Sequence, residues 1–124
     1  QGKDIRLADG TLLANALLTL DPEPSKSYAF CSDTAYLPKL ADWVYGVNYL
    51  YHEATFLDMH QDLAKKTQHS TAAEAAQLAA TAKVGQLILG HFSSRYPDRN
   101  EFITQAQKHF NNVHLAEDGK RFDW

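Results

Sequence analysis

The sequence predicts a single α/β domain, because segments typical of strands alternate with segments typical of helices from residue 27 onward. Its 124 residues suffice for one domain and not for two, and 44% apolar against 22% charged residues is typical of a chain that buries a core. The formal net charge of -3 indicates no strongly basic surface. Charge alone therefore favours no polyanionic partner.

The cysteine content and the hydropathy pattern bear on the compartment. Cys31 is the single cysteine, so the chain has neither an internal disulfide nor a second thiol for a zinc-thiolate site. No apolar run approaches the roughly 18 residues that a membrane span needs, and the N-terminus lacks the charged-then-apolar pattern of a signal peptide. We therefore expect a cytoplasmic protein in a reducing compartment, with no membrane partner.

The first twenty residues are predicted to form a hairpin. Asp9-Gly10 separates two short alternating runs, which is a strong hairpin signal. Residues 21–24 follow as a polar, extended connection, because two prolines restrict their own backbone and that of the residue before each.

The remaining elements follow from apolar periodicity and from turn residues. Thr71 and Glu74 match a capping box at the start of an alanine-rich helix, and Asp98 with Glu101 marks the start of a later one. Strands are predicted at 28–31, 47–51, 86–89 and 112–115, and helices at 35–45, 71–84 and 98–110.

Three predicted strands end on side chains that bind metals or move protons. Asp33 follows the first strand, His52 and Glu53 the second, and His91 the third. In open α/β sheets, ligands bind beyond the carboxyl ends of the strands. Carboxylate and imidazole groups are zinc ligands, so Asp33 and His91 are candidate ligands. Taken singly, each has a simpler interpretation, as a helix cap and as a turn residue.

Two further groups suit hydrolysis of a phosphodiester. Glu53 can orient a second histidine such as His69, which would make a proton-relay pair near a metal. Arg95 offers a guanidinium fork of the shape that binds phosphate. The alternatives are that His69 is an incidental loop residue before a capped helix, and that Arg95 pairs with Asp98.

Four motifs occur in a fixed order: Cys31-Ser32-Asp33-Thr34, His52-Glu53-Ala54-Thr55-Phe56, His69-Ser70-Thr71, and Gly90-His91-Phe92-Ser93-Ser94-Arg95-Tyr96. In order and spacing they resemble the C-terminal half of ribonuclease Z, the zinc-dependent tRNA 3′-processing endonuclease of the metallo-β-lactamase superfamily. The second and third motifs match the HEAT and HST loops of that family letter for letter. The resemblance implies the C-terminal half of a metallo-β-lactamase-type αββα sandwich, with a mixed sheet and helices on one face.

The resemblance also implies a chemistry. The family uses two zinc ions per complete site to hydrolyse a phosphodiester and so remove the 3′ trailer of precursor tRNA. By resemblance, Asp33 would bridge both ions, His91 would bind the second, and Glu53 with His69 would hand a proton to the departing 3′ oxygen. Four residues would line the path of the RNA 3′ end: Thr55, Thr71, Ser93 and Arg95.

The chain departs from the family in one large respect. The His-x-His-x-Asp-His motif that supplies further zinc ligands is absent from the sequence, as is the arm that grips tRNA. We therefore expect a C-terminal half of a longer protein, which by itself binds zinc weakly and cleaves nothing. The inner face of its sheet would be exposed, so we also expect a homodimer.

Two alternative functions stay open. One is another metallo-β-lactamase-fold hydrolase, such as a general phosphodiesterase, with the same metal chemistry and no preference for tRNA. The other is a non-catalytic dimerisation module, which the acidic charge and the missing ligands favour. Intact Asp33, His69 and His91 argue against the module, because dimerisation needs none of them.

Overall fold

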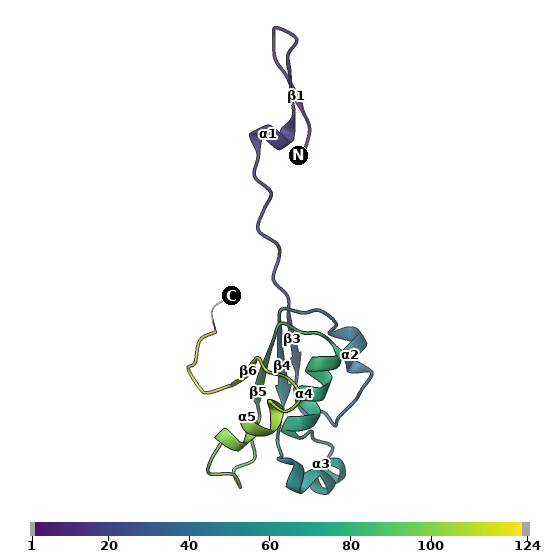
Figure 1. Ribbon diagram of the computed structural model, residues 1–124, viewed down its shortest axis with the longest axis vertical. Coiled ribbons are helices and arrows are strands. Elements are labelled where there is room, and N and C mark those ends of the chain that lie inside the picture. The colour runs from purple at the N-terminus through teal and green to yellow at the C-terminus, as the bar shows by residue number, and fades with distance from the viewer. Residues whose placement is uncertain (1, 123–124) are drawn as a thin grey trace.

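A four-stranded parallel sheet forms the centre of the molecule, as the computed structural model shows for residues 2–122 (Figure 1). Parallel pairing brings the carboxyl ends of all four strands to one edge of the sheet. In the order in which they lie side by side, the strands are β3 (Tyr28–Cys31), β4 (Tyr49–Glu53), β5 (Gln86–Gly90) and β6 (Val113–Leu115).

Helices cover one face of this sheet. They are α2 (Leu40–Trp43), α4 (Ala72–Thr81) and α5 (Asn100–Ala106). A 3-10 turn, η1 (Asp58–His60), and helix α3 (Gln61–Thr67) lie between β4 and α4 in the chain. The α/β class that the sequence predicts is therefore confirmed.

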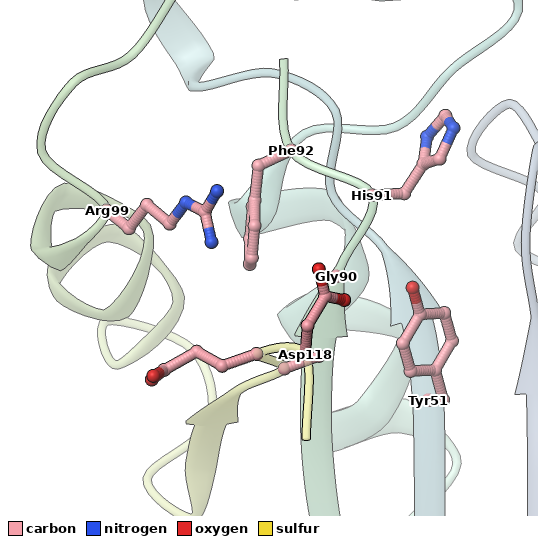
Figure 2. A pocket seen from close by; sticks show the side chains of 8 residues that line it. Tyr51, Gly90, His91, Phe92, Arg99 and Asp118 are labelled. Carbon is pink, nitrogen blue, oxygen red and sulfur yellow. The ribbon is translucent and has the colours of Figure 1, made fainter. Parts of the chain in front are cut away.

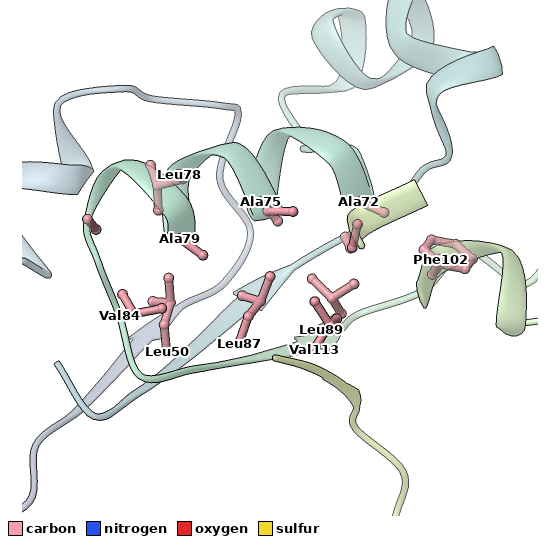
Figure 3. Close-up of a cluster of buried hydrophobic side chains, with 14 of the residues drawn as sticks. Leu50, Ala72, Ala75, Leu78, Ala79, Val84, Leu87, Leu89, Phe102 and Val113 are labelled. Atoms are coloured by element: carbon pink, nitrogen blue, oxygen red, sulfur yellow. The ribbon is translucent and has the colours of Figure 1, made fainter. Parts of the chain in front are cut away.

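Helix α4 packs its alanine face directly onto the sheet (Figure 3). Leu50 of β4 and Leu87 and Leu89 of β5 are fully buried beneath Ala75 and Ala79. Small alanine side chains let the helix backbone approach the strands closely. Full burial of each leucine stabilises the fold by about 2 kcal/mol.

The opposite face of the sheet carries aromatic side chains. Tyr28 and Phe30 of β3 are 48% and 63% exposed, and the ring of Phe30 stacks on that of Tyr51 with centroids 4.5 Å apart. These residues alternate with the buried ones along each strand, as the pleat requires. An apolar face of this kind is typical of an interaction surface.

The four-stranded sheet is parallel, whereas the family resemblance implies a mixed sheet. Each pair of neighbouring strands runs in the same direction, because a crossover containing helix returns the chain to the same end of the sheet. Antiparallel pairing occurs instead in a separate two-stranded sheet of β1 (Ile5–Arg6) and β2 (Leu12–Leu13). The mixed character that the resemblance implies is therefore not found within the four strands of the central sheet.

This N-terminal hairpin lies apart from the central sheet, at the end of an extended connection (Figure 1). Gly10 turns the chain with a φ of 88°, which favours glycine. The short helix α1 (Asn15–Leu18), which no sequence pattern predicted, follows the hairpin. The predicted hairpin is confirmed, and the prolines keep residues 21–24 extended.

The alanine-rich helix has the predicted capping box. The Thr71 hydroxyl accepts a hydrogen bond from the Glu74 amide at 3.2 Å, and the Glu74 carboxylate accepts one from the Thr71 amide at 2.9 Å. Helices α2 and α5 are shorter than predicted. Pro38 keeps the residues before α2 in turns, and hydrogen bonds to the residue three positions earlier tighten the chain after α5.

Helix α3 was not predicted from the sequence. Ala64 is its one buried residue, so it lacks a regular apolar stripe, and it ends at Gln68 in the left-handed conformation. Among residues 2–122, no helix has the length and apolar character needed to cross a bilayer.

Candidate metal centre

Two loops at the carboxyl edge of the sheet bring Asp33 and His91 together. Asp33 follows β3 and His91 follows β5, with β4 between them. Both residues have positive φ values, 50° and 59°, which are uncommon for residues other than glycine and occur often at functional sites. A carboxylate oxygen of Asp33 lies 3.2 Å from Nε2 of His91. The expected proximity of these two side chains is confirmed.

Glu53, at the end of β4, presents a fully buried carboxylate beneath this pair. Its Oε1 accepts hydrogen bonds from the Thr34 amide at 3.1 Å and from Nδ1 of His69 at 2.7 Å. Its Oε2 accepts from the amide and the hydroxyl of Thr55, both at 2.9 Å. Four donors thus satisfy the carboxylate, which is what stable burial of a charged group requires.

His69 is oriented by this carboxylate. Because a carboxylate oxygen only accepts, Nδ1 of His69 carries the proton of the 2.7 Å hydrogen bond, and Nε2 remains available to a ligand or for proton transfer. The side chain is 24% exposed, and its ring centroid lies 5.4 Å from that of His91. The predicted Glu53–His69 pair is therefore present as a contact.

The hydroxyl of Thr55 joins the two histidines to Glu53. It donates to Oε2 of Glu53, so it accepts from Nδ1 of His91 at 2.9 Å. Nδ1 of His69 also lies 3.2 Å from it. With its Nδ1 proton engaged, His91 presents the lone pair of Nε2 toward Asp33.

These residues suit a zinc ion. One ligand atom each from Asp33, His69 and His91 lies within 4.8 Å of the other two. One oxygen and two imidazole nitrogens are a common zinc donor set, and three protein ligands leave a coordination position for substrate. Metal-binding histidines typically donate their second N–H to a carboxylate or another fixed acceptor, as both histidines do through Glu53 and Thr55.

The remaining predicted site residues lie in two places. The Ser93 amide donates to the Thr55 carbonyl at 3.1 Å, and the exposed guanidinium of Arg95 lies over the Phe56 ring, 5.6 Å from its centroid. Both therefore lie beside the candidate metal centre. The side chain of Thr71 is fully buried and caps α4, as the capping-box motif predicts. The contact of its loop with RNA stays a prediction.

A cavity of about 370 Å³ opens beside His91. Figure 2 shows Tyr51 and His91 on one side of Gly90 and Arg99 on the other, with Asp118 near Gly90. A Cβ atom at Gly90 would collide with the Tyr51 hydroxyl, so glycine allows that ring to lie there. The cavity gives a small molecule access to the His91 side of the site.

Sequence reasoning missed one pair that fixes the loop after β4. Nδ1 of His60 lies 2.7 Å from the Tyr96 hydroxyl, which also accepts from the Leu57 amide at 3.2 Å. In the sequence, His60 has no partner at ligand spacing and lies in no recognisable motif. The two residues are 36 positions apart, and no local pattern relates them.

Comparison with solved structures identifies the fold class. The chain superimposes on the metallo-beta-lactamase fold protein YhfI from Bacillus subtilis with a TM-score of 0.72, over 77% of this chain and 39% of that one, at 21% identity. Sheet, helices and strand-end cluster together thus define a protein of the metallo-β-lactamase fold.

Comparison with curated sequences is more specific. The chain is 46% identical over 115 residues to ribonuclease Z of Phocaeicola vulgatus, which is 93% of this chain and 37% of that protein. It is 40% identical over 123 residues to ribonuclease Z of Porphyromonas gingivalis, 99% of this chain and 40% of that protein. A search of protein-family models found no match. The chain is therefore a ribonuclease Z homologue that spans about two fifths of its relatives' length, less than the predicted half.

Proposed function

We propose that the chain supplies part of the active site of a ribonuclease Z-type endoribonuclease, which removes the 3′ trailer of precursor tRNA by phosphodiester hydrolysis. The observation that carries the proposal is the convergence of Asp33, His69 and His91 above the buried carboxylate of Glu53. The 40–46% identity to ribonuclease Z supports the choice of substrate.

Asp33 and His91 would hold zinc, which when bound supplies a Lewis acid that polarises the phosphodiester and activates the attacking water. His69 would deliver a proton from Nε2 to the departing 3′ oxygen. Glu53 favours this role because its carboxylate accepts a hydrogen bond from Nδ1 of His69 and so stabilises the positively charged ring. His69 also lies near enough to act as a ligand. Because the proposal gives its Nε2 to proton transfer, its variants should affect zinc binding less than those of Asp33 and His91.

Arg95 and Ser93 would contact the RNA backbone. The guanidinium of Arg95 is exposed and is held over Phe56, and its Nε donates to the Ser93 hydroxyl at 3.3 Å. This contact orders a long side chain before it meets a phosphate, which reduces the entropic cost of binding.

The chain by itself is proposed to be incomplete. It offers three candidate ligands among residues 2–122, whereas two zinc ions need more, so zinc binding by the chain alone should be weak and cleavage absent. The aromatic face around Phe30 and Tyr51 would pack on the remaining part of the enzyme, or on a second copy of this chain in a homodimer.

The test is reconstitution. The chain is mixed with the part of the Phocaeicola vulgatus ribonuclease Z that it does not span, and the mixture is assayed on a precursor tRNA and on bis(p-nitrophenyl) phosphate. The proposal expects zinc-dependent release of the 3′ trailer, abolished by D33N. Cleavage of the small ester without release of the trailer indicates a general phosphodiesterase instead. Self-association of the chain with no cleavage of either substrate favours the dimerisation module.

A further inference from the structure

His52 is a buried histidine that none of the proposed catalytic steps uses. It belongs to the helix-covered face of β4 and is 0% exposed. Its Nδ1 lies 2.7 Å from the backbone carbonyl of Glu53. Because a carbonyl oxygen only accepts, Nδ1 carries the proton and Nε2 carries a lone pair. Among residues 2–122, Nε2 has no hydrogen-bond partner.

A buried imidazole with an unpaired Nε2 stabilises the fold less than an apolar side chain of similar size would. Burial lowers the pKa of the His52 ring, which is therefore neutral. A buried polar atom without a partner costs free energy, whereas an apolar side chain of similar size would bury the same space without that cost. What the imidazole provides that an apolar side chain does not is the donor at Nδ1.

The donor holds one particular peptide unit. The Glu53 carbonyl accepts from His52, and the amide on the other side of the same peptide, that of Ala54, donates to the Gly90 carbonyl at 2.8 Å. Both polar groups of the Glu53–Ala54 peptide are thus fixed. This peptide begins the turn through which the Thr55 amide and hydroxyl reach the Glu53 carboxylate.

We propose that His52 is a positioning residue. Its Nδ1–H fixes the Glu53–Ala54 peptide and, through it, the geometry in which the Glu53 carboxylate meets Thr55 and His69. The catalytic meaning of this role rests on the proposed function, whereas its structural part is independent of any activity.

Three substitutions separate the donor from the volume of the ring. His52→Asn places an amide nitrogen where Nδ1 was and removes the outer ring atoms. His52→Gln places its amide near Nε2 and provides no donor at the Nδ1 position. His52→Leu fills the site without any polar atom. Leu50→Val, two residues earlier on the same face of β4, controls for general loosening of the core.

The measurement is amide hydrogen exchange of the 124-residue chain by NMR, with the imidazole ¹⁵N spectrum of His69 recorded alongside. The Thr34 and Thr55 amides report on the Glu53 carboxylate, to which both donate. The Leu87 amide, which donates to the Asn112 carbonyl at 2.9 Å, is the internal reference for global opening.

Relative to Leu87, exchange of Thr34 and Thr55 should accelerate about fivefold or more in His52→Leu and His52→Gln, the effect of losing one hydrogen bond. In His52→Asn and in the Leu50→Val control it should stay within about twofold. Unchanged exchange and an unchanged His69 spectrum in His52→Leu would overturn the proposal. So would His52→Asn behaving like His52→Leu, because the donor would then not be what matters.

The reconstituted enzyme adds a functional readout. His52→Leu should lower kcat by roughly tenfold or more with little change in KM, since general acid catalysis depends on geometry, and His52→Asn should recover most of the loss. If exchange behaves as expected but the unmodified enzyme cleaves nothing, the proposed function fails and the positioning role stands. If the unmodified enzyme cleaves precursor tRNA but exchange is unaffected in His52→Leu, the positioning role fails and the proposed function stands.

Discussion

Replacing Glu53 by glutamine tests whether the buried carboxylate organises the site. A carboxylate accepts on both oxygens, and here two backbone amides, those of Thr34 and Thr55, donate to different oxygens. A glutamine amide has one oxygen and one NH₂ group. In either orientation of the amide, its NH₂ group faces the backbone N–H of Thr34 or of Thr55, and a backbone N–H cannot rotate to find another acceptor. One buried donor is therefore left unsatisfied in E53Q, whichever way the side chain lies.

The magnitude follows from the hydrogen bonds. An unsatisfied buried donor costs about 1–3 kcal/mol, and the hydrogen bond from His69 loses its charged partner, for a total of about 3 kcal/mol. For a domain of this size, 1 kcal/mol corresponds to a change in Tm of roughly 4 °C, so Tm should fall by about 12 °C.

The matched control is Glu74→Gln. Glu74 is also buried, but its carboxylate accepts from one backbone amide, that of Thr71, and from the side-chain amide of Gln61, which can rotate. Glutamine satisfies both contacts there, so E74Q should lower stability by less than about 1 kcal/mol. Thermal and urea denaturation of the two variants decide the matter. Equal losses of stability in E53Q and E74Q would refute the reasoning.

Three further changes have expected outcomes. Thr71→Ala removes the cap of α4 and should lower the free energy of unfolding by about 1 kcal/mol in urea denaturation, and no measurable loss would contradict the capping role. Because burial lowers the pKa of His52 below its ordinary 6.5, the unfolded chain binds more protons, so stability should fall as pH drops below about 6.5, with a slope of up to ~1.4 kcal/mol per pH unit. His52→Leu should remove that contribution, and equal pH dependence of the two proteins would count against it. Asp33→Asn should weaken zinc binding in a chelator-competition assay by about tenfold or more, whereas Asp42→Asn, in α2, should leave it unchanged.

Much of the site could be predicted because most of its side chains lie at or directly after the carboxyl ends of predicted strands. Once the strands before Asp33, Glu53 and His91 are identified, parallel pairing places their carboxyl ends at one edge of the sheet. The residues alone suggested that Glu53 pairs with a histidine such as His69, and the family resemblance favoured this pair over an incidental loop residue, because the two lie 16 positions apart in different loops.

Other features depend on tertiary contacts that no local pattern shows. The role of Thr55 as the link between Glu53 and both histidines arises from the packing of three loops. The sequence showed that Thr71 begins a capped helix, but it did not show that its side chain is fully buried. The mixed sheet was implied by the family resemblance, whereas each pair of neighbouring strands in this chain is parallel and is joined by a crossover that contains helix.

The most direct test of the metal centre is an anomalous difference map at the zinc edge, from crystals of the chain grown with zinc. The account predicts a peak between Asp33 and His91, about 2.0–2.1 Å from Nε2 of His91, with Nδ1 of that ring still bonded to Thr55. A zinc peak elsewhere on the chain, or zinc bound through Nδ1 of His91, would contradict the account.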